Sequence, residues 1–277
     1  MFFFKKSFKT IRSIKSIMRQ KTSSTFKNKV VLNYLRCITF SKLKSEKNNL
    51  TLFNHKVRYS FYAGFSYAFH DVFINNEYWF ETNKIAPIIL DCGSNIGLSI
   101  IYFKELYPNC KIISFEPDAD AFECLKFNIE SNAIADVELH NKALSDNESI
   151  IKLSYNENRP GSLTSSTEIV SASTYREVEA VKLSSYINDT IDFMKMDIEG
   201  AETSVFLDLK ESGKLKFIRN IVLEYHHHLG GKKDCLSIVL AILEDYGFSY
   251  QLHSLDHYND HTGGLQLIMI YASQKIT

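Results

Sequence analysis

The stretch Ile88-Ile89-Leu90-Asp91-Cys92-Gly93-Ser94-Asn95-Ile96-Gly97 decides the fold of this chain. An apolar run typical of a buried strand ends in an acid and a glycine-rich turn, and the apolar run 98–103 that follows is typical of a packed helix. Gly93 and Gly97 permit backbone angles and close approaches that a Cβ would forbid. Nucleotide-like cofactors bind at such turns, but a glycine pair alone is weak evidence because tight turns are common in α/β proteins.

A second predicted strand, 111–116, ends in Glu116-Pro117, about 20 residues beyond the glycine turn. A carboxylate at that distance accepts hydrogen bonds from both ribose hydroxyls and repels a 2′-phosphate, which disfavours NADP. The turn itself reads D-x-G-x-N-x-G rather than G-x-G-x-x-G, with Asp91 where a pyrophosphate would approach. An acid there suits a positively charged cofactor without phosphate, such as S-adenosylmethionine.

Further motifs follow along the chain in a definite order. They are Asp91 to Gly97, Phe115-Glu116-Pro117, Asn128, Asn141-Lys142-Ala143-Leu144 and Lys195-Met196-Asp197-Ile198-Glu199-Gly200-Ala201-Glu202. In order and spacing, over about residues 70–230, they resemble the signatures of the FkbM family of S-adenosylmethionine-dependent methyltransferases. The resemblance implies a class I methyltransferase fold that acts on hydroxyls of sugars, glycolipids or polyketide-like natural products. One segment departs from the family, because Leu183-Ser184-Ser185 stands where Leu-Asp-Asp is usual.

Alternating strand and helix patterns predict an α/β fold with a mostly parallel, Rossmann-like sheet. The resemblance implies that a C-terminal hairpin with an antiparallel edge completes this sheet. The predicted strands are 88–92, 111–116, 136–140, 150–154, 178–183, 217–228, 248–255 and 265–272, and the predicted helices are 96–106, 118–131 and 234–246. Ligands of such sheets gather at the carboxyl ends of the strands. We therefore expect Asp91, Glu116, Asn141 and Asp197 to lie close together.

Charge divides the chain into unequal parts. Residues 1–47 hold 13 Lys or Arg and a single acid, Glu46, whereas the whole chain has 32 residues of each sign, so the rest is strongly acidic. We expect a basic N-terminal extension (1–47), a cap segment (48–84) and a methyltransferase domain (85–277). The aromatic residues of the cap segment are interpreted chiefly as core.

The N-terminus predicts a basic amphipathic helix. Its apolar positions are Phe4, Phe8, Ile11, Ile14, Ile17 and Met18. It contains no continuous apolar run long enough to span a bilayer, and it lacks the cleavage pattern of a secretory signal. Residues 1–25 are therefore expected either to contact an anionic membrane from the cytoplasmic side or to pack on their own domain or a partner, with a mitochondrial presequence as a lesser alternative.

The five cysteines are odd in number and form no Cys-x-x-Cys pair. They indicate neither a disulfide framework nor a thiolate zinc site, and they favour a reducing cytoplasm. Cys92, beside the glycine turn, is interpreted as a buried structural residue.

The cofactor hypothesis assigns one role to each group of residues. Gly93, Asn95 and Gly97 shape the methionine pocket, Asp91 holds the ammonium group and Glu116 binds the ribose. Asn141 and Ala143 are expected to lie against the adenine.

Residues 193–202 form the strongest catalytic candidate, because an apolar strand delivers a lysine and several carboxylates to one turn. Lys195 and Asp197 share a strand face and are expected to form an ion pair. Asp197 is the first candidate for the base that removes the hydroxyl proton, and His226 is the second. Glu199 and Glu224 are candidate substrate residues, whereas Glu202 is expected to cap the helix that begins near Ala201.

Glu224 and His226 lie on one face of the strand 217–228. With Asp197 and Glu199 they are also candidate ligands of a divalent metal, but no spacing matches a fixed ligand signature, so metal-free catalysis is preferred. In the loop 161–167, Ser162 is a candidate substrate residue, because the resemblance implies a Gly-Ser segment near the active site. The alternative for this segment is a surface loop.

The principal prediction is an S-adenosylmethionine-dependent enzyme that methylates a sugar hydroxyl of a glycan, glycolipid or related product, with no nucleic-acid partner. An NAD-dependent nucleotide-sugar oxidoreductase explains Glu116 but predicts more glycine and no acid at the turn. A non-catalytic membrane-associated scaffold explains the basic extension but has no need of Asp91, Glu116 and Asp197. The oligomeric state is left open.

Overall fold

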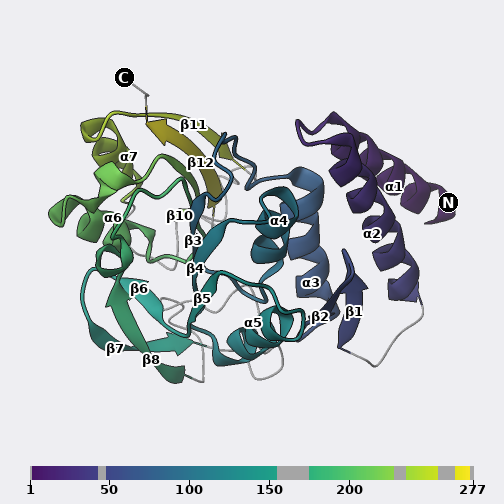
Figure 1. The fold of residues 1–277 in the computed structure, drawn as a ribbon, viewed down its shortest axis with the longest axis horizontal. Coiled ribbons are helices and arrows are strands. Elements are labelled where there is room, and N and C mark those ends of the chain that lie inside the picture. Colours follow the sequence, from purple (N-terminus) through teal and green to yellow (C-terminus); the bar gives the residue numbers. More distant parts are fainter. Residues whose placement is uncertain (1, 43–47, 155–174, 228–234, 255–265, 275–277) are drawn as a thin grey trace, which may run out of the picture.

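The computed structural model describes residues 2–42, 48–154, 175–227, 235–254 and 266–274. Its centre is a seven-stranded sheet in the order β11-β12-β10-β9-β3-β4-β5 (Figure 1). The strands are β3 (Ile88–Cys92), β4 (Lys111–Phe115), β5 (Val137–His140), β9 (Phe193–Met196), β10 (Asn220–His227), β11 (Phe248–Ser254) and β12 (Gln266–Gln274). Within this sheet, as far as it is described, β12 alone runs antiparallel. The predicted α/β class is confirmed, but the antiparallel strand lies between β10 and β11 instead of at the edge.

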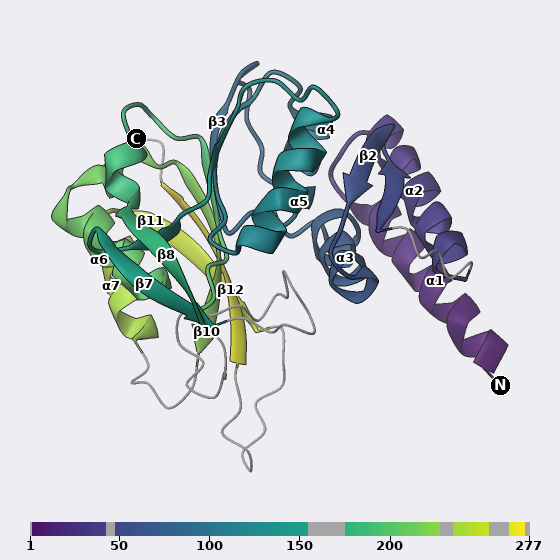
Figure 2. The same ribbon diagram turned by 90° about the horizontal axis from the view of Figure 1, so that it is seen from below.

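Helices cover both faces of the sheet. Helices α4 (Leu98–Leu106) and α5 (Ala119–Glu130) lie on one face, and α6 (Glu202–Glu211) and α7 (Leu236–Asp245) lie on the other (Figure 2). Asp118 caps α5 as expected, because its side chain accepts hydrogen bonds from the N–H groups of Asp120 and Ala121. The chain passes from β4 on one side of β3 to β9 on the other, which opens a crevice at the carboxyl ends of these strands.

A smaller sheet in the order β6-β8-β7 lies on the α6 side of the molecule (Figure 1). It contains β6 (Ala143–Ser145), β7 (Ser149–Ser154) and β8 (Tyr175–Lys182). The predicted strands 150–154 and 178–183 correspond to β7 and β8, while β6 is too short to have produced a sequence pattern. The 3-10 turn η2 (Leu183–Tyr186) follows, and there Ser184 bonds to Asp208 of α6 through its N–H and hydroxyl at 2.9 and 2.7 Å.

The N-terminal part forms a layer outside α4 and α5 (Figure 2). It comprises α1 (Phe2–Arg19), α2 (Ser24–Lys42), β1 (Asn49–Leu52), β2 (His55–Arg58), α3 (Tyr62–Phe69) and the π-helical turn η1 (His70–Asn75). Strand β2 ends at Arg58, and the chain turns into α3 at Tyr62. One hydrophobic cluster runs from Ile17 through Phe73 to Tyr102, so these helices share a core with the sheet.

Helix α1 packs on η1 through part of its surface only. Ile17 is buried, and Ser16 and Gln20 donate hydrogen bonds to the carbonyls of Phe73 and Ile74. Ile11 and Met18 remain 51% and 50% exposed. The apolar residues of this helix are therefore divided between its own domain and the surface. In the described part of the chain, no helix is long and apolar enough to cross a membrane.

Candidate active site

The glycine turn after β3 is shaped by the segment after β9. Gly93 has φ +82°, and a Cβ placed on it would collide with the carbonyl oxygen of Asp197. Gly97, at φ +85°, precedes the first residue of α4, and a Cβ there would meet Leu125. Gly93 therefore permits contact between the two strand ends, whereas Gly97 permits packing of α4 on α5.

A cavity of about 690 Å³ opens beside this turn. Its polar lining consists of Asn95, Glu116, Asp118, Lys142, Asp197 and Glu199, and its apolar lining includes Phe115, Ala143, Leu144 and Leu153. This mixture of apolar side chains and a few polar groups is typical of a small-molecule site. Four carboxylates against one lysine give the cavity a negative charge, which favours a cationic ligand and disfavours a pyrophosphate.

Glu116 is oriented by two backbone groups. The N–H of Asn95 donates to Oε2 at 2.7 Å, and the N–H of Asp118 donates to Oε1 at 2.8 Å. Burial nevertheless raises the pKa of Glu116 to about 8. Its carboxylate thus stands at the cavity wall in a fixed orientation, as a ribose-binding acid requires.

Asp91 lies below the turn and is completely buried. Its Oδ2 accepts a hydrogen bond from Ser99 Oγ at 2.6 Å, while Oδ1 has no hydrogen-bond partner among the described residues. Lys195 Nζ is 3.8 Å from Oδ1. The charge of Asp91 is therefore balanced by Lys195, although its Oδ1 lacks a hydrogen bond within the described part of the chain.

Three of the predicted cofactor residues, Asp91, Gly97 and Asn141, line neither this cavity nor the neighbouring acidic one. Gly97 has the packing role described above, and Asn141 Nδ2 donates to the carbonyls of Glu116 and Pro117 at 2.8 and 3.2 Å. Asn141 therefore supports the turn that carries Glu116 instead of facing the adenine site, whereas Ala143 lines the cavity as predicted.

A second cavity, which we call the acidic cavity, adjoins the first and shares Gly93, Asn95, Asp197 and Glu199 with it. Asp71 from the cap segment, Lys195 and Glu224 complete its charged lining, and Tyr78, Ser94 and Ser99 bring hydroxyl groups to it. Burial, together with repulsion from Asp197, raises the pKa of Asp71 to about 6. For the nearby Glu77, burial and the charge of Asp71 raise the pKa to about 7.

Lys195 crosses beneath both cavities. Its Nζ lies 3.8 Å from Asp197 Oδ2, which confirms the predicted ion pair, and it donates hydrogen bonds to the carbonyls of Cys92 and Gly93. Burial opposes its charge, but the carboxylates of Asp197 and Asp91 outweigh burial and raise the pKa of Lys195. The lysine therefore stays protonated and binds the ends of β3 and β9 together.

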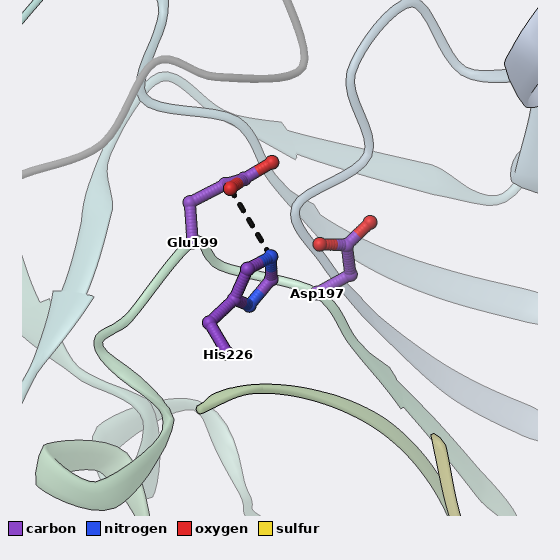
Figure 3. A group of neighbouring side chains, drawn as sticks. All are labelled: Asp197, Glu199 and His226. Atoms are coloured by element: carbon purple, nitrogen blue, oxygen red, sulfur yellow. Dashed lines mark ion pairs between the residues drawn. The ribbon is translucent and has the colours of Figure 1, made fainter. Parts of the chain in front are cut away.

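His226 is surrounded by carboxylates. Its Nδ1 is 2.9 Å from Glu202 Oε1, and its Nε2 is 3.1 Å from Glu199 Oε2 (Figure 3) and 3.9 Å from Glu224 Oε1. Burial lowers the pKa of His226, but the hydrogen bonds to Glu199 and Glu202 prevail and raise it to about 12. Burial and the charge of Asp197 raise the pKa of Glu224 to about 9.

The remaining predictions have different outcomes. Glu202 accepts the N–H of Gly200 at 2.9 Å, which confirms a helix-start role and adds an unpredicted contact to His226. Ser162 lies outside the described residues. The sequence analysis missed Asp71, whose only signal was its place in the aromatic-rich cap segment, and interpreted Tyr78 of the same segment chiefly as core, whereas it lines the acidic cavity. Ser184 and Ser185, which stand where the family usually has two aspartates, line neither cavity. This departure from the family pattern therefore does not change the described walls of the two cavities.

Comparisons with known proteins identify the family of this chain. The family model described as "Methyltransferase FkbM domain" matches residues 91–250. Methyltransferase sdnD of Sordaria araneosa is 27% identical over 215 residues, which cover 66% of this chain and 81% of that protein. Methyltransferase 1 of Beauveria bassiana is 24% identical over 226 residues, with coverages of 72% and 89%.

Among solved structures, a methyltransferase FkbM from Methylobacillus flagellatus aligns with a TM-score of 0.46 and 14% identity, and covers 95% of this chain and 59% of that one. The family match spans more than half of the chain and contains the glycine turn, Glu116, Asp197 and His226. The chain therefore belongs to the FkbM methyltransferase domain family.

Proposed function

We propose that this protein transfers a methyl group from S-adenosylmethionine to a sugar hydroxyl of a glycan, glycolipid or related natural product. The observation that carries the proposal is the junction of two cavities at Gly93, Asp197 and Glu199. One cavity has the ribose-binding carboxylate and the other has a dense set of proton acceptors. A cofactor in the first and an acceptor in the second would meet at Asp197.

The residues present fit the cofactor. Glu116 is suited to the ribose hydroxyls, Ala143 and Leu144 to the adenine, and Asp91, with its orphaned oxygen, to the ammonium group. When bound, the cofactor supplies an electrophilic methyl group on a sulfonium centre. The excess of carboxylates in the cavity favours this positive charge.

The chain's own residues supply orientation and proton removal. Asp197 lies on the shared wall and is partly exposed, so its carboxylate is placed to accept the hydroxyl proton. Lys195 anchors Asp197 at 3.8 Å. His226 has carboxylates at both ring nitrogens and is better suited to holding Glu199 and Glu202 than to accepting a proton.

The test begins with calorimetric titration of S-adenosylmethionine, S-adenosylhomocysteine and NAD into the full chain. We expect both sulfur compounds to bind and NAD not to bind. A panel of neutral sugars is then screened for release of S-adenosylhomocysteine. Asp197→Asn should slow transfer to any accepted sugar by about 10²–10⁴-fold while S-adenosylmethionine binding changes little. If the folded protein binds neither sulfur compound, the non-catalytic scaffold becomes the preferred interpretation.

We also propose that the helices α1 and α2 attach the protein to an anionic membrane from the cytoplasmic side. Residues 9–39 contain eight Lys or Arg and no acid. Ile11 and Met18 lie seven residues apart on one exposed face of α1, with Lys15 between them. Apolar side chains set among basic ones are the pattern of an interfacial helix.

A further inference from the structure

The turn after β9 and the end of β10 bring three metal-ligating side chains together (Figure 3). Asp197 and Glu199 each offer a carboxylate oxygen and His226 offers a ring nitrogen, and these three atoms lie within 4.8 Å of one another. The residues come from neighbouring parallel strands, paired through Val222 and Lys195. The set therefore depends on the register of the sheet and not on a local sequence signature.

The imidazole is held in the orientation that a metal ligand needs. Glu202, which is 1% exposed, lies 2.9 Å from Nδ1, and this leaves Nε2 directed at Glu199. Metal-binding histidines almost always donate their second ring N–H to a carboxylate or carbonyl group, which fixes the tautomer and the ring plane. Glu202 is placed to be that second-ring partner.

The spacing of the ligand atoms suits a small divalent ion. Bonds of 2.0–2.1 Å to an octahedral ion place neighbouring ligands about 3 Å apart and opposite ligands about 4.2 Å apart. His226 Nε2 and Glu199 Oε2 are separated by 3.1 Å, and all three ligand atoms lie within 4.8 Å of one another. One imidazole with two carboxylates is a donor set that Mn²⁺ accepts.

Two further side chains line the acidic cavity beside the cluster. Tyr78 is 6% exposed, and the ammonium group of Lys195 lies 5.5 Å from the centre of its ring. Glu224 Oε1 lies 3.9 Å from His226 Nε2. Lys195, the lysine of this cavity, is already bound to Cys92, Gly93 and Asp91. Four carboxyl groups and this one lysine line the cavity, and carboxylate oxygens are ligands that divalent cations prefer.

We infer that Asp197, Glu199 and His226 form a divalent-cation site at the junction of the two cavities, oriented by Glu202, in which the bound ion displaces the proton between His226 Nε2 and Glu199 to solvent. The ion would lie where an acceptor hydroxyl must come, so its role in catalysis, though not its binding, rests on the proposed function. A cation at a hydroxyl lowers the cost of removing its proton and fixes the oxygen in place. Ligation of Asp197 through one oxygen leaves the other free to accept that proton.

The experiment measures Mn²⁺ binding to the metal-stripped full chain by calorimetry and by electron paramagnetic resonance. We expect one Mn²⁺ per chain, with altered resonance relative to the free ion. Glu199→Gln and His226→Gln should each weaken binding at least tenfold, and Glu202→Gln should weaken it by about 10–100-fold through loss of ring orientation. Circular dichroism and thermal melting establish that each variant is folded.

Glu138→Gln is the matched control, because Glu138 also faces a histidine, His140, at 2.8 Å but offers no third ligand. It should leave Mn²⁺ binding unchanged. The inference is overturned if the folded chain binds no Mn²⁺ at millimolar concentration, or if binding survives both Glu199→Gln and His226→Gln. S-adenosylmethionine is titrated into the same metal-free sample, so loss of that binding alone would contradict the proposed function and leave the cation site standing.

Discussion

The backbone N–H of Asn95 donates a 2.7 Å hydrogen bond to Glu116 Oε2, so the turn after β3 orients the acid that ends β4. Asn95 has φ +49°, in the left-handed region between the two glycines. The two halves of the predicted cofactor motif are therefore one structural unit, in which the glycine turn positions the carboxylate as well as approaching the ligand.

Replacement of Glu116 tests the cofactor assignment directly. Hydrogen bonds to a charged group contribute about 1.5–3 kcal/mol each, so Glu116→Gln should weaken S-adenosylmethionine binding by roughly 10–100-fold in calorimetry. Glu138→Gln, at an exposed carboxylate of β5, should leave the affinity unchanged. If the wild type and Glu116→Gln bind S-adenosylmethionine with equal affinity, the ribose does not bind at Glu116.

The pH dependence of cofactor binding follows from the pKa of Glu116, which burial raises to about 8. The ionised form accepts from the ribose hydroxyls, so affinity should rise as pH increases toward 8, by up to about tenfold per unit, and then level off. Titrations from pH 6 to 9 measure this, and Glu116→Gln should lack this component of the rise. A pH-independent affinity of the wild type contradicts the prediction.

The raised pKa of Glu116 also makes the free energy of unfolding of the unliganded protein depend on pH. The folded state holds the Glu116 proton more tightly than the unfolded state, so its contribution to stability is complete below about pH 4.5 and is lost as pH rises through about 8. Urea unfolding of wild type and Glu116→Gln should show a difference in stability that grows between these pH values.

Gly93 and Gly213 form a matched pair for the glycine turn. Both have positive φ, but a Cβ on Gly213 meets nothing within 4 Å, whereas one on Gly93 meets the Asp197 carbonyl. Gly213→Ala should cost about 1 kcal/mol of unfolding free energy, from the left-handed backbone alone. Gly93→Ala should cost at least about 2 kcal/mol and abolish S-adenosylmethionine binding. Equal losses in urea unfolding would show that the contact with Asp197 is dispensable.

Asn128 ties the cap segment to the main domain. Its side chain accepts from the N–H of Arg58 at 2.6 Å and donates to the carbonyls of Arg58 and Ile96 at 2.9 and 2.8 Å, all while fully buried. Asn128→Ala should cost about 3 kcal/mol, because it leaves buried groups unsatisfied. Asn132→Ala removes a similar set of bonds to Lys56 at a more exposed site and should cost about 1 kcal/mol in the same unfolding assay.

Membrane attachment is tested by co-sedimentation with vesicles. The wild type should bind vesicles that contain anionic lipid and not neutral ones, with binding that weakens as salt increases. The double variant Ile11→Glu, Met18→Glu should bind at least tenfold more weakly. Ile238→Glu alters an exposed apolar residue of α7 and serves as the control. If the double variant binds anionic vesicles as well as the wild type, the exposed face of α1 does not attach the protein to the membrane. Packing of this face against a partner protein would then be the preferred interpretation.

Much of the site could be predicted because it follows strand ends. Asp91, Glu116 and Asp197 each come after an apolar run, and parallel strands bring such ends to one edge of the sheet. The same rule failed for Asn141, whose side chain turns back to the Glu116 carbonyl, because the rule places a residue at the edge without giving its side-chain direction.

The sequence by itself determined the alternating strands and helices, the basic N-terminal helix and the acids at the strand ends, since each is encoded by a local pattern of polarity or by a residue type. Only the tertiary structure decided that Asp71 and Tyr78 join Asp197 in one cavity, that Glu202 orients His226, and which part of α1 packs inward. These arrangements join segments far apart along the chain. They depend on how whole elements pack, and no local periodicity encodes that packing.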